Sequence, residues 1–518
     1  ALMFIQVILK GFGVIEKSIL GHLFGTSFIT DVYMNARDIA FYLFQMVEQV
    51  IMHSFLPVFV QRQREHGEQD AWRLASTTFN LLITLMAIIA VVGMLFTRQI
   101  LPLFVPDWFS ATATVDPRLI PLLILLTRWM LVAVIFMSTS SLTYCLLNSY
   151  KQFALPASAD LVLKGAVLLF AILFAHAWGP YALAVGFVCG ALAKLAVHGI
   201  GLRQQLQEYR PVIAISHPGF KRFLILALPL LAGVLVSILR QVMDQRFTSS
   251  LASGSLTALK FAKTLTDTPV TIFPYAFGIA LFPFLADIAV AGDKARLRQM
   301  LMSATRMMIL IFIPLAVLII MLREPLVIAV FGPKSLQAAE PLQLYACGML
   351  VGALEIIVLQ FFFAMSDTLW PTIIGFAVVP LHIGMSYLGV YDWKIGVLGI
   401  ALALLVSKGT KVFILYALIR KRLGALEGRK TLILLGKVAL SLLPMFLLLW
   451  AAVNFLPEPG AVKGRLQKVL VLVPYFLTGG VGLATYLFVL HALHVDEMTL
   501  LLARVRGKLR RGHSSANA

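Results

Sequence analysis

Residues 79–97 read FNLLITLMAIIAVVGMLFT, a stretch without a single Asp, Glu, Lys or Arg. Residues 438–457 and 469–495 are equally free of these four residue types. An α-helix needs roughly 20 mostly apolar residues to cross the hydrocarbon core of a bilayer, and these stretches have about that length. The regular alternation of apolar and polar residues that marks a membrane β-barrel is absent. The three stretches therefore predict an all-α integral membrane protein.

The composition of the whole chain supports this fold class. Of the 518 residues, 60% are hydrophobic and 13% are charged, whereas a soluble domain carries about 25% charged residues. Apolar windows separated by short polar stretches predict about fourteen transmembrane helices. Their approximate ranges are 2–22, 30–57, 78–102, 119–148, 156–177, 180–202, 222–248, 256–286, 301–322, 342–365, 371–391, 395–419, 431–455 and 467–494.

The net charge of +19 is distributed in a way that indicates lipid rather than nucleic acid as the partner. Basic residues concentrate in alternate short loops and in the C-terminal tail, whereas the intervening loops hold few. This pattern follows the positive-inside rule and predicts that both termini lie in the cytoplasm. Attraction to anionic lipid headgroups accounts for the basic loops, so we expect membrane lipids as partners and no nucleic acid. The loop residues are Arg62, Arg64, Arg73, Arg203, Arg210, Lys221, Arg222, Lys294, Arg296, Arg298, Arg420, Lys421, Arg422, Arg429 and Lys430.

Motifs for enzymatic chemistry are missing from the sequence. No P-loop, dinucleotide-binding fingerprint, HExxH or nucleophile elbow occurs, so we expect no catalytic residues, no cofactor and no metal. The three cysteines, Cys145, Cys189 and Cys347, lie in apolar stretches and predict neither a disulfide nor a metal site. We see no cleavable signal peptide, and because the chain starts at Ala1 instead of Met, we expect a few residues to precede it.

The chain repeats itself weakly. Residues 55–57 (FLP) and 281–283 (LFP) each precede a polar loop and an apolar span, and residues 148–156 and 364–371 each place a polar linker before a helix-opening proline. Two halves with the same order of spans imply a parallel repeat, the plan of many secondary transporters. We therefore predict a six-helix half over 1–204, a second over 205–425, two additional transmembrane helices over 426–500 and a basic cytoplasmic tail over 501–518.

Charged residues cluster in four of the predicted spans, the first and second of each half. A charge at mid-bilayer costs several kcal/mol, so it normally faces a partner or a water-filled cavity. The set comprises seven bases and six acids, a slight excess of positive charge that favours an anionic ligand. We predict that these residues line one polar chamber. They are Lys10, Glu16, Lys17, Asp31, Arg37, Asp38, Glu48, Arg240, Asp244, Arg246, Lys260, Lys263 and Asp267.

Structural explanations for part of this set stay open. Arg240 and Asp244 are four residues apart on one predicted helix and are placed to neutralise each other. Arg37 and Asp38 would serve equally well as structural ion pairs to neighbouring helices. The predicted chamber therefore needs the charged side chains to meet in space.

Several short strings occur in an order and spacing that resemble one family over essentially the whole chain. They are residues 23–31 (LFGTSFITD), 54–57 (SFLP), 251–255 (LASGS), 281–283 (LFP) and 363–371 (FAMSDTLWP). In these strings the chain resembles the MviN/MurJ family, the lipid II flippases of the MOP exporter superfamily, and it looks like a divergent member. The resemblance implies that the first, second, seventh and eighth spans line a central cationic cavity for a polyprenyl-pyrophosphate-linked saccharide.

The resemblance also assigns individual positions. Lys10 stands where the family has an essential arginine, Asp31 matches an aspartate at the start of the second span, and Thr257 matches a small hydroxyl residue on the eighth. The chain departs from the family pattern at Glu16-Lys17, where an arginine-aspartate pair is usual, and at Lys263-Thr264, where an aspartate-arginine pair is usual.

Our leading hypothesis is a flippase that moves an undecaprenyl-linked saccharide, lipid II or a related cell-envelope or polysaccharide precursor, across the bacterial cytoplasmic membrane by alternating access. The alternatives are a drug or cation antiporter of the same superfamily, which should have an acid-dominated cavity, and a non-transporting membrane scaffold for glycan synthesis. We expect the protein to act as a monomer. The predicted substrate-binding residues are Lys10, Lys17, Arg37, Arg240, Lys260, Lys263 and Thr257, and the predicted gating or ion-pair residues are Glu16, Asp31, Asp38, Asp244 and Asp267.

Overall fold

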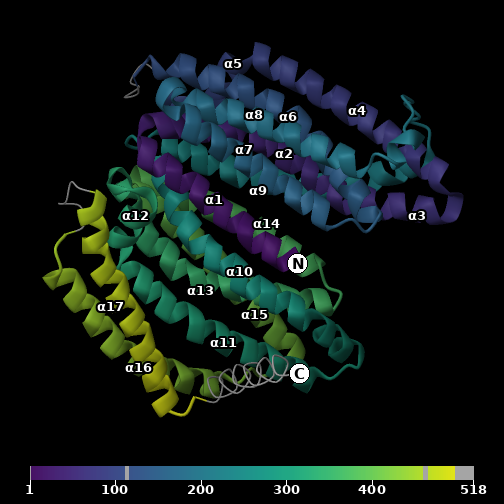
Figure 1. Ribbon diagram of the computed structural model, residues 1–518. Coiled ribbons are helices and arrows are strands. Elements are labelled where there is room, and N and C mark those ends of the chain that lie inside the picture. Colours follow the sequence, from purple (N-terminus) through teal and green to yellow (C-terminus); the bar gives the residue numbers. More distant parts are fainter. Residues whose placement is uncertain (1, 111–115, 459–464, 496–518) are drawn as a thin grey trace, which may run out of the picture. The chain divides into compact units, whose positions relative to one another are not determined.

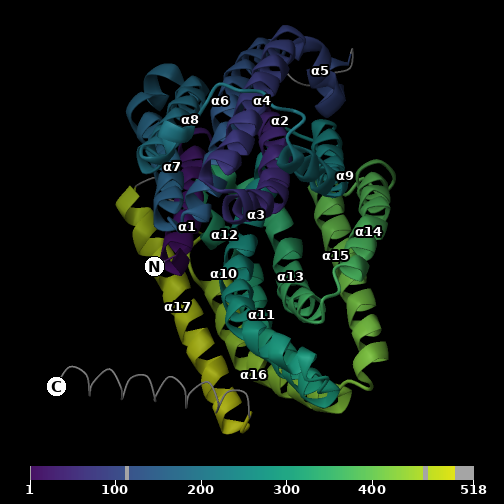
Figure 2. The ribbon, with the colours of Figure 1, turned by 90° about the vertical axis from the view of Figure 1, so that its right-hand side faces the viewer.

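The computed structural model describes residues 2–110, 116–458 and 465–495, and within these residues it contains helices and no strand. Figures 1 and 2 show the helices from two directions. The predicted all-α fold class is therefore confirmed. The helices are α1 Leu2–Phe24, α2 Phe28–Val50, α3 Leu56–His66, α4 Glu68–Leu95, α5 Thr97–Phe104, α6 Leu119–Ser149, α7 Ala154–Trp178, α8 Pro180–Gly201, α9 Pro218–Ser249, α10 Ser255–Val290, α11 Lys294–Met321, α12 Arg323–Phe331, α13 Ala339–Ala364, α14 Leu369–Tyr387, α15 Val397–Leu423, α16 Gly428–Phe455 and α17 Arg465–Ala492.

Twelve helical segments in the described part of the chain are long and apolar enough to cross a membrane. The predicted ranges 2–22 and 256–286 are helical as α1 and α10 but are not among the twelve, so the predicted count of fourteen is approximate. The span predicted over 78–102 is two helices, because α4 begins at Glu68 and ends at Leu95 and the short α5 follows. The acidic first turn of α4 complements the positive end of the helix dipole, which favours this earlier start.

The chain forms two compact units, each with its own packing. Unit 1 comprises residues 1–261 and 383–400, and unit 2 comprises residues 262–382 and 401–518. The boundaries predicted from the repeat, at 204/205 and 425/426, stay a prediction. The predicted basic tail over 501–518 lies outside the described residues.

In unit 1, α6 packs against α2, α4 and α8. Its segment 138–143 is rich in small hydroxyl residues that are buried. Thr139 and Ser140 each donate a hydrogen bond of 2.7 Å to the backbone carbonyl four residues earlier, so their polar atoms are satisfied within the helix. Small side chains of this kind let helix backbones approach closely in a membrane protein. This packing places α2, which carries the predicted site residues Asp31, Arg37 and Asp38, against α6.

The helices α7 and α8 pack through glycine. A Cβ atom built at Gly190 would lie 2.7 Å from the carbonyl oxygen of Leu163, and one at Gly186 would lie 2.8 Å from the Cβ atom of Phe170. Glycines four residues apart on one helix face allow this close crossing. The two helices therefore form one tight pair beside α6.

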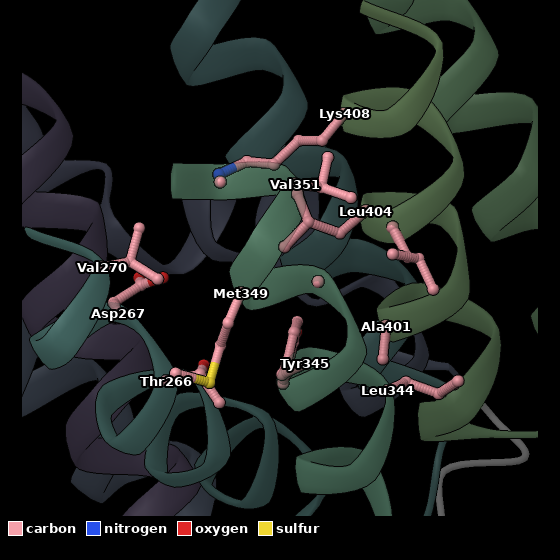
Figure 3. Close-up of a pocket in the computed structure, with 13 residues that line it drawn as sticks. Thr266, Asp267, Val270, Leu344, Tyr345, Met349, Val351, Ala401, Leu404 and Lys408 are labelled. Carbon is pink, nitrogen blue, oxygen red and sulfur yellow. The ribbon is translucent and has the colours of Figure 1, made fainter. Parts of the chain in front are cut away.

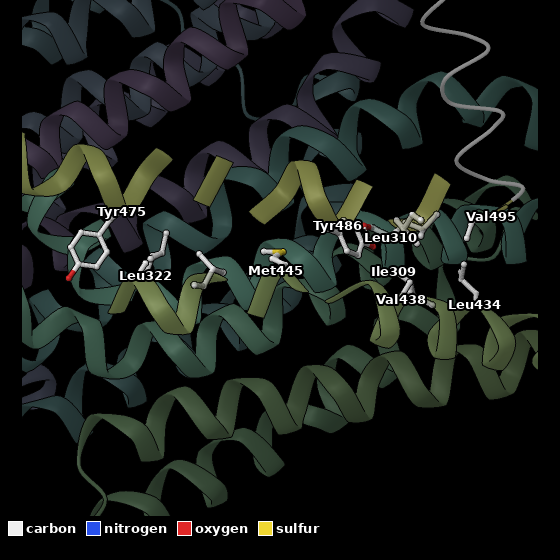
Figure 4. Close-up of a cluster of buried hydrophobic side chains, with 12 residues drawn as sticks. Ile309, Leu310, Leu322, Leu434, Val438, Met445, Tyr475, Tyr486 and Val495 are labelled. Carbon is white, nitrogen blue, oxygen red and sulfur yellow. Dashed lines mark hydrogen bonds between the residues drawn. The ribbon is translucent and has the colours of Figure 1, made fainter. Parts of the chain in front are cut away.

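In unit 2, α16 and α17 pack against each other and α16 packs on α11. Figure 4 shows the buried apolar cluster that joins them, with Met445 and Leu434 from α16, Tyr486 from α17, and Leu310 from α11. The Tyr486 hydroxyl donates a hydrogen bond of 3.0 Å to the backbone carbonyl of Leu310. A tyrosine that buries its ring and still satisfies its hydroxyl fixes the angle and register of such a contact.

Candidate functional site

A chain of ion pairs in unit 1 joins α1, α2 and the first turns of α10. The Arg37 guanidinium lies 3.1 Å from the Glu16 carboxylate and 4.0 Å from the Asp38 carboxylate. Lys260 donates to the other oxygen of Asp38. All four side chains are mostly buried, between 13% and 21% exposed. Two acids and two bases meet here, so the group is neutral.

This arrangement can bind an anion if the anion takes the place of the carboxylates beside Arg37 and Lys260. Arg37 presents five N–H donors and Lys260 presents three, and the carboxylates of Glu16 and Asp38 accept hydrogen bonds from them. A phosphate placed between the two cations would accept charge-assisted hydrogen bonds from both. When the phosphate leaves, the carboxylates neutralise the two cations again. This matters because burying an unpaired charge costs free energy.

Asp31 holds the start of α10. Its carboxylate is 3% exposed and accepts hydrogen bonds from the backbone N–H of Gly254 at 2.7 Å, the backbone N–H of Thr257 at 2.8 Å and the hydroxyl of Thr257 at 2.6 Å. A carboxylate at a helix N-terminus satisfies orphan N–H groups and complements the helix dipole. Asp31 therefore caps a helix that lies more than 220 positions later in the chain.

Uncharged polar residues connect α2 to α9, and the sequence analysis missed them. The amide of Gln245 donates to Asn35 and accepts a 3.0 Å hydrogen bond from the Tyr42 hydroxyl. The Asn35 amide in turn donates to the backbone carbonyl of Asp31 at 2.9 Å. Residues 31, 35, 38 and 42 follow helical spacing on one face of α2, a signal that a count of charges alone does not detect.

The other predicted residues of unit 1 lie outside the ion-pair chain. Arg240 lies 3.4 Å from Asp244 on the same helix, as the structural explanation for this pair expects. Lys10 is exposed and makes no ion pair within the described residues, and Lys17 is half-buried next to Glu16. The structure thus brings together Glu16, Arg37, Asp38 and Lys260, and separately Asp31 and Thr257.

A second buried polar group lies between α7 and α8. Lys194, 5% exposed, forms a 2.6 Å ion pair with Asp160. One turn further along α8, the ring of His198 makes a 2.8 Å hydrogen bond with Thr143 of α6. These residues were not assigned to the predicted chamber, and local pairing explains them.

In unit 2, the predicted residues Lys263 and Asp267 lie on α10, where Lys263 is half-buried and Asp267 is exposed. A further charged group in the same unit was not assigned to the predicted chamber. Glu355 of α13 is paired with Lys411 at 2.7 Å and with Lys408 at 3.6 Å, both from α15. One turn apart on α15, the two lysines share a carboxylate that is mostly buried.

At the loop between α15 and α16, Glu427 pairs with Arg306 of α11 at 3.0 Å and with Lys430 at 3.5 Å. Burial raises the pKa of Glu427, but the hydrogen bond from Arg306 and the charge of Lys430 outweigh it and hold the pKa below its usual value. This pair ties the loop to α11 at neutral pH.

No group of three or more His, Cys, Asp or Glu side chains close enough to hold a metal ion occurs within residues 2–110, 116–458 and 465–495. Cys145, Cys189 and Cys347 are free thiols.

Comparison with known proteins assigns the chain to a family. A family model described as lipid II flippase MurJ matches residues 20–465. The lipid II flippase MurJ of Burkholderia cenocepacia is 26% identical to the chain over 423 residues, which cover 79% of this chain and 81% of that protein. The family match includes α2 and the α10 residues that meet it within unit 1.

Two solved structures share the fold. A lipid II flippase MurJ in an inward closed conformation matches with a TM-score of 0.74 at 18% identity, over 94% of this chain and 98% of that one. An inward-facing multidrug resistance MATE family transporter of the MOP superfamily matches with a TM-score of 0.66 at 13% identity, over 80% and 95% of the two chains. The family predicted from the short strings is confirmed by the family match: the chain belongs to the MurJ lipid II flippases, multi-pass transporters of the bacterial inner membrane that move a lipid-linked cell-envelope precursor.

Proposed function

We propose that this chain carries an undecaprenyl-linked saccharide from the cytoplasmic to the outer leaflet by alternating access, and that the ion-pair chain Glu16–Arg37–Asp38–Lys260 receives its diphosphate. The supporting observation is that two cations from different helices are held by carboxylates close enough to exchange for an anion. Arg37 offers a planar fork to phosphate oxygens, and Lys260 offers a point charge that favours release.

The remaining predicted residues take supporting roles in this proposal. Lys10 and Lys17 on α1 and Arg240 on α9 add positive charge along the path, and Lys263 does so on α10. Asp244 and Asp267 offset these charges when no substrate is bound. Asp31 and Thr257 keep the N-terminus of α10 against α2, so that Lys260 stays within reach of Asp38.

The test is the translocation of a fluorescent lipid-linked disaccharide in vesicles that contain the purified protein. We expect Lys260→Gln and Arg37→Gln each to lower the initial rate tenfold or more, because each removes a cation that would hold the diphosphate. Lys221→Gln is the matched control, since Lys221 is an exposed base at the start of α9 and outside the network. Wild-type rates in both network variants would refute the assignment of the diphosphate site.

A depletion experiment in cells separates this function from the alternatives. We expect loss of the protein to cause accumulation of one lipid-linked saccharide, identified by mass spectrometry. An unchanged lipid profile together with altered drug tolerance would instead support a drug or cation antiporter, which should have an acid-dominated cavity. An unchanged lipid profile together with unchanged drug tolerance would favour a scaffold role.

We further propose that the protein works as a monomer with both termini in the cytoplasm. The alternating basic loops support this orientation. Light scattering of the detergent-purified protein should give the mass of one chain, and a reporter fused at residue 518 should be active only in the cytoplasm. A dimer mass, or a reporter active outside, would contradict the respective proposal.

A further inference from the structure

Unit 1 contains a second charged group, formed by α2, α7 and α8, that the proposed diphosphate site does not use. Lys194 of α8 is 5% exposed and lies 2.6 Å from the Asp160 carboxylate of α7. Glu48 of α2 is half-buried and close enough for its charge to interact with both of these residues. Two carboxylates therefore meet one lysine in this group.

Local pairing explains Asp160 and Lys194, but it does not explain Glu48. The Glu48 carboxylate makes no hydrogen bond and no ion pair with any residue that the structure describes. Glu48 lies near the middle of the helical run Phe28–His66, which is long and apolar enough to cross a membrane. An ionised side chain in such a segment is costly, and it is typical of ion and proton pathways.

A fully buried histidine next to this group also has an unused polar atom. His198 lies one turn after Lys194 on α8, and its Nδ1 atom is 2.8 Å from the Thr143 hydroxyl of α6. Its Nε2 atom has no hydrogen-bond partner of normal geometry within the described residues. The ring interacts with the charges of Lys194 and Asp160. Because an imidazole can take up and release a proton, His198 offers a second proton-binding group beside the ion pair.

The other titratable groups around Glu48 do not provide it with a counter-charge. Tyr144 and Cys145 of α6 lie within reach of its charge, and both are weak acids that are neutral when protonated. Lys164 of α7 donates a hydrogen bond of 2.7 Å to a backbone carbonyl of α1. The acids that interact with Lys164 are Glu16 and Asp160. Glu48 is therefore left without a base of its own.

The charged group of unit 2 has the opposite composition. There a single carboxylate, that of Glu355, has two lysine partners, Lys411 at 2.7 Å and Lys408 at 3.6 Å. Figure 3 shows Lys408 of α15 and Asp267 of α10 at the border of a pocket in this unit. Glu355 is thus neutralised by lysines, whereas a proton would have to neutralise Glu48.

The helix α2 connects this group to the proposed diphosphate site. Glu48 follows Arg37 by eleven residues, about three helical turns, so both lie on the same face of α2. Directly after α2, the chain continues as a π-helical segment over Ile51–Phe55. Such segments are rare and often lie at functional sites. A change of charge at Glu48 therefore acts on the same helix that carries Arg37.

We propose that Glu48 binds a proton beside the Asp160–Lys194 pair, and that uptake and release of this proton are coupled to the movement of the substrate. A proton suits the group better than a metal ion, because a metal ion needs several oxygen ligands and Lys194 would repel it. The inference rests on the proposed flippase function and names the ion that drives it.

A pH gradient across the vesicle membrane tests the coupling. The translocation assay is run with the side that receives the substrate acidic, and again with equal pH on both sides. We expect the gradient to raise the wild-type initial rate threefold or more and to leave the rate of Glu48→Gln unchanged, because glutamine cannot bind the proton. Glu48→Asp should keep part of the response. Glu65→Gln is the matched control and should respond like the wild type, since Glu65 is an exposed carboxylate of the same helical run.

Infrared difference spectra of the detergent-purified protein, recorded between mildly acidic and mildly alkaline pH, detect the proton without transport. The wild type should show a carboxylic acid signal that is absent in Glu48→Gln and unchanged in Glu65→Gln. Asp160→Asn should also abolish the signal, because Lys194 would then be left to pair with Glu48.

The outcomes separate this inference from the flippase function. Wild-type transport that ignores the pH gradient or follows a sodium gradient would overturn the inference and leave the flippase function intact. A response to the pH gradient that persists in Glu48→Gln would overturn it as well. Failure of the wild type to move substrate, with the infrared signal present, would refute the flippase function and leave a proton site at Glu48.

Discussion

At the residue scale, Asp31 shows how one buried carboxylate can have a structural role within a predicted transport site. Its two oxygens accept three hydrogen bonds from Gly254 and Thr257, and Asp31 is 3% exposed. Thr257 was predicted to bind substrate, and its side chain is fully buried with its hydroxyl proton directed at Asp31. The position of α10 relative to α2 in unit 1 therefore depends on this contact.

We expect Asp31→Asn to destabilise the protein by roughly 1–3 kcal/mol, because an amide offers one acceptor in place of two and places a donor against backbone N–H groups. The midpoint of thermal unfolding in detergent would report this loss. Thr257→Val removes a single hydrogen bond and should cost less. If Asp31→Asn unfolded like the wild type but no longer transported substrate, a direct gating role would replace the structural one.

At the element scale, the crossing of α7 and α8 depends on the absence of a side chain. The Cβ atom of an alanine at position 190 would meet the backbone oxygen of Leu163 at 2.7 Å, and backbone atoms cannot rotate away as a side chain can. The two helices would have to separate. Because α8 also packs on α6, the strain would reach the centre of unit 1.

We expect Gly190→Ala to lower stability by roughly 1–3 kcal/mol, the usual cost of overpacking a close contact. Gly199→Ala on the same helix is the matched control, since a Cβ atom there has no neighbour within 4 Å and alanine favours a helix over glycine. The midpoint of thermal unfolding should fall in Gly190→Ala, and it should rise or stay unchanged in Gly199→Ala. Equal losses would show that the crossing is not the cause.

At the scale of the whole molecule, the proposed diphosphate site uses the same charges that stabilise the fold. Removing one member of a buried ion pair leaves the other charge unpaired, which costs roughly 3–5 kcal/mol when burial is complete, whereas removing both is close to neutral. The Glu16–Arg37 pair is partly exposed, so the penalty here should be smaller. Stability and transport should therefore respond differently to single and double substitutions.

We expect Arg37→Gln alone to lose both thermal stability and transport, and Glu16→Gln with Arg37→Gln to recover stability without recovering transport. Unfolding midpoints and the vesicle assay, measured on the same preparations, give both quantities. Recovery of transport in the double variant would mean that Arg37 serves only to neutralise Glu16.

Much of the fold followed from the sequence because hydropathy is local. A stretch such as residues 79–97 excludes charge over its whole length and has to be a buried or membrane-spanning helix, whatever its neighbours are. Charged positions such as Arg37 and Lys260 were identified for the same reason, since an ionised group inside an apolar stretch is costly. Helix boundaries were less accurate, as α4 and α5 illustrate, because polar residues such as those at the start of α4 are compatible with both loop and helix.

The sequence by itself determined that this is a helical membrane protein of the MurJ family with charged residues on particular helices. Only the tertiary structure decided which charges meet: Arg37 with Glu16 and Asp38, Asp31 with the start of α10, and Glu355 with two lysines of α15. The physical reason is that the cost of burying a charge depends on the residue's own position along an apolar stretch. The partner of that charge is determined by how the helices pack, and the two can lie more than 200 positions apart in the sequence. A local sequence pattern does not contain this information.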